Sequence, residues 1–308
     1  MRRRDLRKSI RTAAGASILA AAIAAGAACG PGRPEAATKP AVDIAALQKE
    51  IVEKLAGAAE IAPGLKLANR FAPENKAAAR EYLAALWTKL GLEVQKQDYS
   101  PEGENLYAVV PATGPAPGGA ETVIVGAHYD SARNTPGASD NATGIALVTA
   151  VAVEIARTEP RRRDFIFILF DEEERGMRGS RAFAQKAKDE GIKVHSVHTA
   201  DQTGWDKDGD RAVELEIPFE GAVALYEAQA KAMTPPVPLL VTKEAGSDHS
   251  AFRRLGFSAV GITEEYRNKD TTPHIHRPTD TADTVDFVYL ANTTALVVRV
   301  MKALARQE

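Results

Sequence analysis

The sequence predicts an α/β fold: a single-domain, three-layer sandwich in which a mixed, mostly parallel sheet carries helices on both faces. One observation is a set of short, continuous apolar runs at residues 122–126, 165–170 and 257–262. Such runs are typical of strands buried on both faces of a covered sheet. A second observation is that segments with the apolar spacing of helices stand between them, and this alternation indicates a layered α/β architecture. The chain shows neither an internal repeat nor a second globular unit, so residues 41–308 are expected to form one domain.

Each expected element has its own local signal. Apolar residues at helical spacing predict helices over residues 42–58, 74–90, 144–157, 180–190, 222–233 and 287–305. Gly91 is expected to end the second of these, because glycine readily adopts the left-handed conformation found at helix ends. Apolar or alternating runs predict strands over residues 92–99, 105–110, 122–126, 165–170, 194–200 and 257–262.

The N-terminal residues differ from the rest of the chain. Residues 1–11 carry six basic residues and one acid, and an alanine-rich apolar run follows to residue 28. This order is typical of a bacterial export signal, and the run is too short for a convincing membrane span. Cys29, the only cysteine, stands where a lipoprotein signal carries its lipidated residue, and residues 29–40 are rich in Pro and Gly, as a tether would be. We therefore expect residues 1–28 to direct export to the bacterial cell envelope and lipidated Cys29 to attach the protein to the membrane. The alternative is an ordinary secretory signal with a periplasmic or secreted product.

The composition limits the choice of partners. Hydrophobic residues make up 44 % and charged residues 26 %, which is typical of a globular protein. Residues 1–28 hold six of the 39 basic and one of the 41 acidic residues, so the remainder carries 33 basic and 40 acidic residues. No basic patch is left there to indicate a nucleic-acid partner.

The stretch from residue 123 to 144 contains the first candidate site residues. His128 and Asp130 follow a predicted strand, and side chains two positions apart in a strand lie on the same face. Asp130 can therefore hold one ring nitrogen of His128 and leave the other for a metal ion. Asp140 lies just before a predicted helix, and a His with an Asp from two loops at one sheet edge suits a catalytic zinc ion. The alternative interpretation is a hydrogen-bonded histidine and an aspartate that caps the helix.

An acidic run at residues 171–174 directly follows the predicted strand 165–170. Open α/β sheets build their sites at the carboxyl ends of their strands. Carboxylates crowded there repel one another unless a cation or solvent offsets their charge. One of them can bind a metal ion while a neighbour takes a proton from water. Taken alone, the run also fits a solvated acidic turn that caps the next helix.

Polar loops with histidines flank the predicted strand 257–262. Residues 246–249 (Gly-Ser-Asp-His) precede it, and His274, His276 and Asp280 follow it. Asp280, four residues after His276, can orient that histidine or cap residues 281–286. A lone histidine is more often structural than a metal ligand.

In this combination and order, the motifs resemble peptidase family M28, the co-catalytic dizinc aminopeptidases and their relatives. One motif would be weak evidence, whereas six in the family order are not expected by chance. The matching segments are AHYDS at 127–131, GASDNATG at 137–144, EERGMRGS at 173–180, DQTG at 201–204, GSDHSAF at 246–252 and HRPTDT at 276–281.

The resemblance implies two Zn²⁺ ions as cofactors. It implies that His128 and Asp201 bind one ion, that Glu174 and His276 bind the other, and that Asp140 bridges them. Zinc ions in such a pair polarise the scissile carbonyl and lower the pKa of a water molecule.

The resemblance also implies the residues that support this chemistry. Glu173 resembles the general base, which accepts the proton of the attacking water and passes it to the leaving amine. Asp130 resembles the carboxylate that orients the metal-binding histidine.

Three departures from the family pattern accompany the resemblance. The chain has three consecutive glutamates where the family usually has two, and alignment on Gly176 selects the second and third of them. His274 competes with His276 as a ligand, and the Asp-Thr spacing selects His276. Some relatives place a tyrosine shortly before Ser-Asp-His to polarise the substrate carbonyl. This chain has none at 243–246, and Tyr266 is the candidate substitute.

The expected function is zinc-dependent exopeptidase hydrolysis, foremost by an aminopeptidase that removes N-terminal residues from peptides. Alternatives within the resemblance are a carboxypeptidase and a glutaminyl cyclase-like acyltransferase, and the latter tends to work with one zinc ion. The presence of both His128 and Asp201 argues against the cyclase. An alternative from another class is a non-catalytic, lipid-anchored binding protein. The intact Glu173 argues against this alternative.

Overall fold

A computed structural model describes residues 41–243 and 246–307 of the chain. The expected export signal, Cys29 and the tether to residue 40 lie outside the described residues. Val42–Glu308 form one compact unit.

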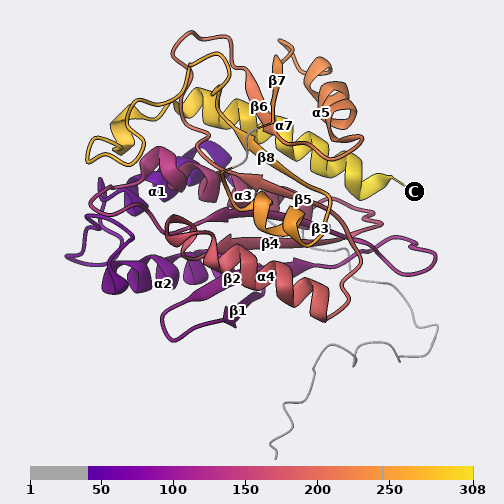
Figure 1. Ribbon diagram of the computed structural model, residues 1–308, viewed down its shortest axis with the longest axis horizontal. Helices are drawn as coiled ribbons and strands as arrows, with labels where there is room; N and C mark the ends of the chain where they lie inside the picture. Colours follow the sequence, from indigo (N-terminus) through magenta and orange to yellow (C-terminus); the bar gives the residue numbers. More distant parts are fainter. Residues whose placement is uncertain (1–40, 244–245, 308) are drawn as a thin grey trace, which may run out of the picture. The chain divides into compact units, whose positions relative to one another are not determined.

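The unit contains helices and strands in alternation over most of its length (Figure 1). Its α-helices are α1 (Ile44–Leu55), α2 (Pro73–Lys89), α3 (Gly144–Ala156), α4 (Arg178–Asp189), α5 (Ala222–Lys231), α6 (His249–Arg254) and α7 (Phe287–Arg306). Its strands are β1 (Val94–Asp98), β2 (Glu104–Val110), β3 (Thr122–His128), β4 (Asp164–Phe170), β5 (Val194–Ala200), β6 (Val213–Glu216), β7 (Leu239–Thr242) and β8 (Ala259–Thr263). The chain turns at Gly91 as expected, with φ 83°, directly after Leu90, the C-cap of α2.

All eight strands join one mixed sheet in the order β1-β2-β4-β3-β5-β8-β6-β7. The four central strands, β4, β3, β5 and β8, run parallel to one another. β2 pairs antiparallel with β4 at one side, and β6 pairs antiparallel with β8 at the other. The carboxyl ends of the parallel strands therefore meet at one edge of the sheet.

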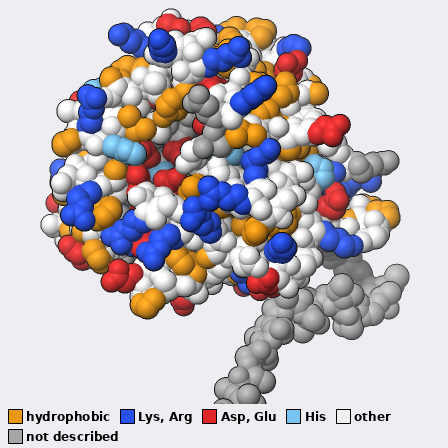
Figure 2. Space-filling model, viewed as in Figure 1, with side chains coloured by type: hydrophobic (Ala, Val, Ile, Leu, Met, Phe, Trp, Pro, Cys, Tyr) orange, Lys and Arg blue, Asp and Glu red, His pale blue; other side chains and the backbone are white. Residues whose placement is uncertain are grey.

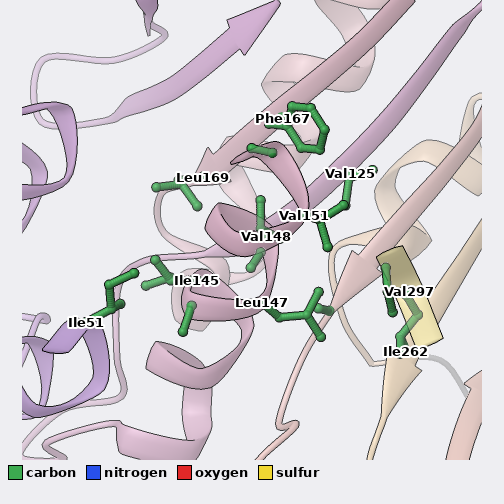
Figure 3. Close-up of a cluster of buried hydrophobic side chains, with 14 of the residues drawn as sticks. Ile51, Val125, Ile145, Leu147, Val148, Val151, Phe167, Leu169, Ile262 and Val297 are labelled. Atoms are coloured by element: carbon green, nitrogen blue, oxygen red, sulfur yellow. The ribbon is translucent and has the colours of Figure 1, made fainter. Parts of the chain in front are cut away.

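Helices cover both faces of this sheet, which confirms the predicted three-layer architecture. On one face, α1, α2, α3, α5 and α7 pack against alternate residues of the strands; on the other, α4 and α6 do so. The first layer is dominated by α3, whose residues are buried almost throughout. Figure 3 shows its side chains against those of the strands and of α1 and α7: Ile145, Leu147, Val148 and Val151 against Val125, Phe167, Leu169, Ile262, Ile51 and Val297.

Three elements were not expected from the sequence. β6 and β7 are strands of four residues each, too short for a hydrophobic period to stand out, and α6 has six residues. β6 reads Val-Glu-Leu-Glu, and its two glutamates occupy one face beside β8. Tertiary pairing, rather than local propensity, makes this segment a strand.

Helix α7 has the length and apolar composition of a membrane span. Half of the apolar stretch is buried inside the unit, and residues such as Leu296, Val297 and Val300 are part of the hydrophobic core. Among the described helices, it is the only one with this property, and its packing is that of a core helix.

Candidate metal centre

The predicted ligands come from five loops or strand ends that the fold gathers at the carboxyl edge of the parallel strands. His128 is the last residue of β3, and Asp201 directly follows β5. Glu174 belongs to the helical turn Glu173–Arg175 after β4, and Asp140 to the turn Ala138–Thr143 before α3. His276 lies in the long loop after β8 and has φ 55°.

These side chains form two clusters that share one carboxylate. In the first cluster, His128 Nε2 lies 3.2 Å from Asp140 Oδ1 and 3.4 Å from Asp201 Oδ1. In the second, His276 Nε2 lies 3.1 Å from Asp140 Oδ2 and 3.2 Å from Glu174 Oε2. One ligand atom from each residue of a cluster lies within 4.8 Å of the others. Asp140 thus offers one oxygen to each cluster, the arrangement of a bridging ligand.

The donor set fits a pair of metal ions. His128 Nε2, Glu174 Oε1 and Asp201 Oδ1 are buried and lack a hydrogen-bond partner among the described residues. Buried polar atoms are normally satisfied, so unpartnered atoms on three candidate ligands require an explanation. Two mixed sets of imidazole nitrogen and carboxylate oxygen suit catalytic zinc better than structural zinc.

The electrostatics of the clusters lead to the same conclusion. Burial disfavours a charged His128, but the charge of Asp201 and the close carboxylates of Asp130 and Asp140 raise the pKa of His128 well above its usual value. Burial likewise opposes ionisation of Asp140, yet His128 and His276 hold the pKa of Asp140 below its usual range. The carboxylates thus draw positive charge onto the histidines, and metal cations would supply that charge instead.

The turn before α3 places Asp140 by close packing against the end of β5. A Cβ at Gly144 would lie 2.2 Å from Asn141 Oδ1 and 2.7 Å from the carbonyl oxygen of Ala200. Asn141 also donates to that carbonyl oxygen at 2.9 Å. Only glycine at the first position of α3 allows this approach.

Asp130 contacts His128 and also holds the glutamate turn. Its Oδ1 lies 3.4 Å from His128 Nδ1, as the resemblance implies. Its two carboxylate oxygens also accept hydrogen bonds from the backbone N–H groups of Glu173 and Glu174, at 3.0 and 3.2 Å. One carboxylate therefore couples the position of a histidine ligand to that of the adjacent glutamates.

The structure distinguishes the three consecutive glutamates. The buried Glu172 carboxylate belongs to neither cluster and forms ion pairs at 3.2–3.5 Å with the buried Lys76 and with the more exposed Arg175 and Arg178. Glu173 lines the pocket above the clusters, and Glu174 belongs to the second cluster. This placement agrees with the register chosen by alignment on Gly176.

Glu173 lies in surroundings that favour a proton acceptor once metal is present. Burial raises the pKa of Glu173 to about 10, opposed by His128 and reinforced by the carboxylates of Asp248 and Asp201. Nearby cations would lower this pKa, because they stabilise the ionised carboxylate. Without metal, Glu173 is held protonated; with metal, it can serve as a base.

Three residues beside the clusters have roles that the sequence did not predict. Asp280 neither orients His276 nor caps the segment after it: its carboxylate accepts the backbone N–H groups of Ser139 and Asp140, at 2.8 and 3.1 Å. Ser247 donates to Asp201 Oδ2 at 2.6 Å. Asp248 is buried beside the clusters, and burial raises its pKa to about 7. The Ser-Asp-His motif is the sequence signal that could have identified Ser247 and Asp248.

Replacing Asp280 by asparagine is expected to weaken metal binding about 10- to 100-fold, the usual effect of losing an outer-shell partner. Its carboxylate accepts two N–H groups, and an amide would face one of them with its own N–H₂ group. The measurement is a zinc titration against a chromogenic chelator. Asp283→Asn, which removes the charge of an exposed neighbour, is the matched control. Equal zinc affinity of the two variants would contradict the proposed role of Asp280.

The clusters open into a pocket with a cavity volume of about 350 Å³. Figure 2 shows a hollow on this face with acidic side chains at its floor and a histidine at its edge.

Tyr266 lines the pocket and donates its hydroxyl hydrogen to Gln202 Oε1. Burial and the charge of Asp201 raise the pKa of Tyr266, so its hydroxyl stays a donor. Its suggested role in polarising a carbonyl remains a prediction.

The other histidines lie outside the clusters. His274 Nδ1 contacts Thr279 Oγ1 at 2.9 Å. His198 is buried and bonds to Tyr226 and Ser196, and burial lowers its pKa to about 3. His195 Nδ1 contacts Ser196 Oγ at 2.9 Å. These contacts are those of structural residues.

An α/β sheet with paired His-carboxylate clusters at the carboxyl ends of its parallel strands defines a class of metal-binding proteins. Within that class, residues 105–301 match peptidase family M28, and the chain belongs to this family.

Relatives and solved structures agree with this assignment. The chain is 28 % identical over 213 residues to a probable leucine aminopeptidase of Arthroderma otae, covering 61 % of this chain and 55 % of that protein. It is 25 % identical over 195 residues to aminopeptidase YwaD of Bacillus subtilis, covering 61 % and 42 %. The chain thus spans about half the length of the curated relatives it matches.

The fold is similar to LapB from Legionella pneumophila, with a TM-score of 0.73, 22 % identity and coverage of 85 % of this chain and 72 % of that one. It is also similar to Porphyromonas gingivalis glutaminyl cyclase, with a TM-score of 0.66, 16 % identity and coverage of 84 % and 98 %. At these identities the likeness shows the fold alone.

Proposed function

We propose that the protein is a zinc-dependent aminopeptidase that uses two Zn²⁺ ions to remove N-terminal residues from peptides. The observation that carries this proposal is the pair of clusters joined by Asp140, with Glu173 beside them in the same pocket. The names of the relatives support the aminopeptidase activity, and they include a zinc aminopeptidase of Bacillus subtilis, 21 % identical with a TM-score of 0.60.

The donors assign each ion a place. His128 and Asp201 would hold one ion, Glu174 and His276 the other, and Asp140 both. When bound, the ions polarise the scissile carbonyl and make a water molecule more acidic. Asp130 would hold the His128 ring and the backbone of Glu173 and Glu174 in the positions that metal binding and proton transfer need.

Glu173 carries the proton. Its carboxylate accepts a proton from the attacking water, and the same oxygen then delivers that proton to the nitrogen of the leaving amine as the peptide bond breaks. Water adds to the carbonyl carbon, and the products are a free amino acid and a peptide shortened by one residue. Tyr266 lines the same pocket, and its hydroxyl, turned away from Gln202, would donate a hydrogen bond to the carbonyl oxygen, in the role that some family members give to a tyrosine elsewhere in the chain.

The crowded carboxylates of this pocket favour an aminopeptidase over a carboxypeptidase. The zinc ions would offset the charges of their ligands and of Glu173, and the carboxylate of Glu216, which also lines the pocket, would then add a negative field that attracts the ammonium group of a peptide N-terminus. The same field would repel the C-terminal carboxylate that a carboxypeptidase must bind.

The likeness to a glutaminyl cyclase makes cyclisation the second candidate. The clusters argue against cyclisation, because both have complete donor sets and a second metal site is not needed to cyclise glutamine. Incubation with a peptide that begins with glutamine distinguishes the two: loss of ammonia without chain shortening would indicate the cyclase.

The test of the proposed function is hydrolysis of a panel of aminoacyl-anilides by the full chain. We expect release of the aniline to stop after chelation and to return when zinc is added, with about two ions per chain at full activity. Thermal stability should fall on chelation, because metal binding stabilises the folded state by mass action. Retained metal without hydrolysis of any free-amine substrate would contradict the proposal and favour a carboxypeptidase or a binding protein.

A further inference from the structure

The pocket that contains the metal clusters continues beneath the end of β8 towards β6 and β7. Glu216, Thr242 and Thr263 line this extension, together with Gly246. Of the described residues that line the pocket, Glu216 is the one carboxylate that belongs neither to the clusters nor to the candidate base. Its side chain is 14 % exposed.

The strand register places Glu216 relative to the clusters. Glu216 pairs with Gly261 on β8, and Gly261 pairs with Thr199 on β5, two residues before Asp201. Strands lie about 4.8 Å apart and rise about 3.3 Å per residue. A group above Gly261 is therefore displaced from Asp201 by one strand, and by about 6–7 Å along the strand.

The Glu216 carboxylate lies above Gly261 because that residue has no side chain. A Cβ at Gly261 would be 2.5 Å from Glu216 Oε2 and 2.8 Å from His249 Nδ1. His249 Nδ1 lies 3.7 Å from the same Glu216 oxygen. Burial, reinforced by Arg253, lowers the pKa of His249 to about 4, so this ring adds no positive charge there. The extension of the pocket thus contains the largely buried carboxylate of Glu216, which is set away from the metal ligands.

The metal clusters fix where a peptide substrate must lie in this pocket. Its scissile carbonyl must lie against the clusters, and its α-amine is only one carbon further. A carboxylate one strand aside and deeper in the pocket is beyond the α-amine and within reach of a long side chain. The hydroxyl-bearing Thr242 and Thr263 line the same path.

We propose that Glu216 binds the ammonium or guanidinium group of an N-terminal lysine or arginine, which makes peptides with basic N-terminal residues the preferred substrate class. The inference rests on the proposed aminopeptidase function and adds its side-chain selectivity. Hydrogen bonds between charged groups are stronger than those between neutral groups, and their strength increases where water is largely excluded. The flexible four-carbon stem of lysine suits a carboxylate at this depth.

The test compares substrates that differ only at the end of the side chain. The kcat/KM for the lysine anilide is measured against that for norleucine, and that for arginine against citrulline, which replaces the guanidinium by a neutral urea. We expect the charged member of each pair to be preferred about 10- to 100-fold in the wild type, as befits a charge-assisted hydrogen bond. In Glu216→Gln, both ratios should fall to within about twofold of unity, because the amide keeps the volume and removes the charge.

Glu220→Gln is the matched control, since it removes one exposed charge just after β6 and should keep the wild-type ratios. Equal kcat/KM for lysine and norleucine in the wild type would overturn the inference. A Glu216→Gln variant with unchanged ratios, or with all substrates reduced in equal proportion, would also overturn it.

Binding separates this inference from the proposed function. If no anilide is hydrolysed, calorimetry of the zinc-loaded chain with lysinamide and norleucinamide makes the same comparison. Tighter binding of lysinamide would support the role of Glu216 even though the aminopeptidase proposal had failed, and equal affinities would overturn it.

Discussion

Replacing Glu173 by glutamine is expected to lower kcat by a factor of about 10² to 10⁴, the usual contribution of a positioned general base. The amide keeps the shape of the side chain but cannot take a proton from the attacking water. Glu173 is outside both clusters, so zinc should stay bound with unchanged stoichiometry. The measurement is steady-state hydrolysis of an anilide substrate, together with metal analysis of the same sample. A variant with more than a tenth of the wild-type kcat would remove Glu173 from the mechanism.

Glu172→Gln is the matched control, because it makes the same chemical change one residue earlier. Glu172 is 1 % exposed, and its carboxylate is paired with Lys76, Arg175 and Arg178. Breaking a buried ion pair, such as the one between Glu172 and Lys76, destabilises the fold by about 3 kcal/mol. We therefore expect denaturant unfolding to show a loss of stability, while kcat of the folded fraction stays near the wild-type value. The opposite pattern would mean that the register of the glutamates is shifted by one residue.

Replacing Asp140 by alanine is expected to have the second large effect, the loss of both metal ions. Its two oxygens lie 3.2 Å from His128 Nε2 and 3.1 Å from His276 Nε2, so a single substitution removes a ligand from each cluster. His128→Ala and His276→Ala each remove a donor from one cluster only. Metal analysis after dialysis at equal free zinc should therefore give fewer ions for Asp140→Ala than for either histidine variant.

Activity should follow the metal content. With neither ion held firmly, we expect Asp140→Ala to retain less than about a thousandth of the wild-type kcat/KM, since the ions supply most of the electrostatic stabilisation. Two tightly bound ions in this variant would show that another residue bridges them.

Much of the fold could be predicted from local patterns in the sequence. The strands with continuous apolar runs, β3 and β4, were predicted to within one or two residues of their observed ends, because burial on both faces leaves a strong signal. Strand β6 carries glutamates at alternate positions and has only four residues, so its sequence gives no comparable signal. Its pairing with β8 depends on residues about 45 positions away, which no local window contains.

The residues of the candidate site show the same contrast between what motifs predict and what distant contacts decide. His128, Asp140, Glu174, Asp201 and His276 were identified by motif order, and the structure brings all five together in two clusters. Asp280 was assigned the wrong partner, because its position four residues after His276 indicated a local interaction. Its carboxylate instead bonds to residues about 140 positions earlier in the chain.

The sequence by itself determined the layered α/β class, the family and the residues able to hold metal, since these depend on residue types and their order. Only the tertiary structure decided that the extra glutamate, Glu172, pairs with three basic side chains, which aspartate supports the bridging residue, and that Glu216 enters the pocket. These are relations between strands and loops distant in the chain. Their geometry is set by the pairing of β5, β8 and β6 and by the absence of a side chain at Gly261, which leaves room for the Glu216 carboxylate.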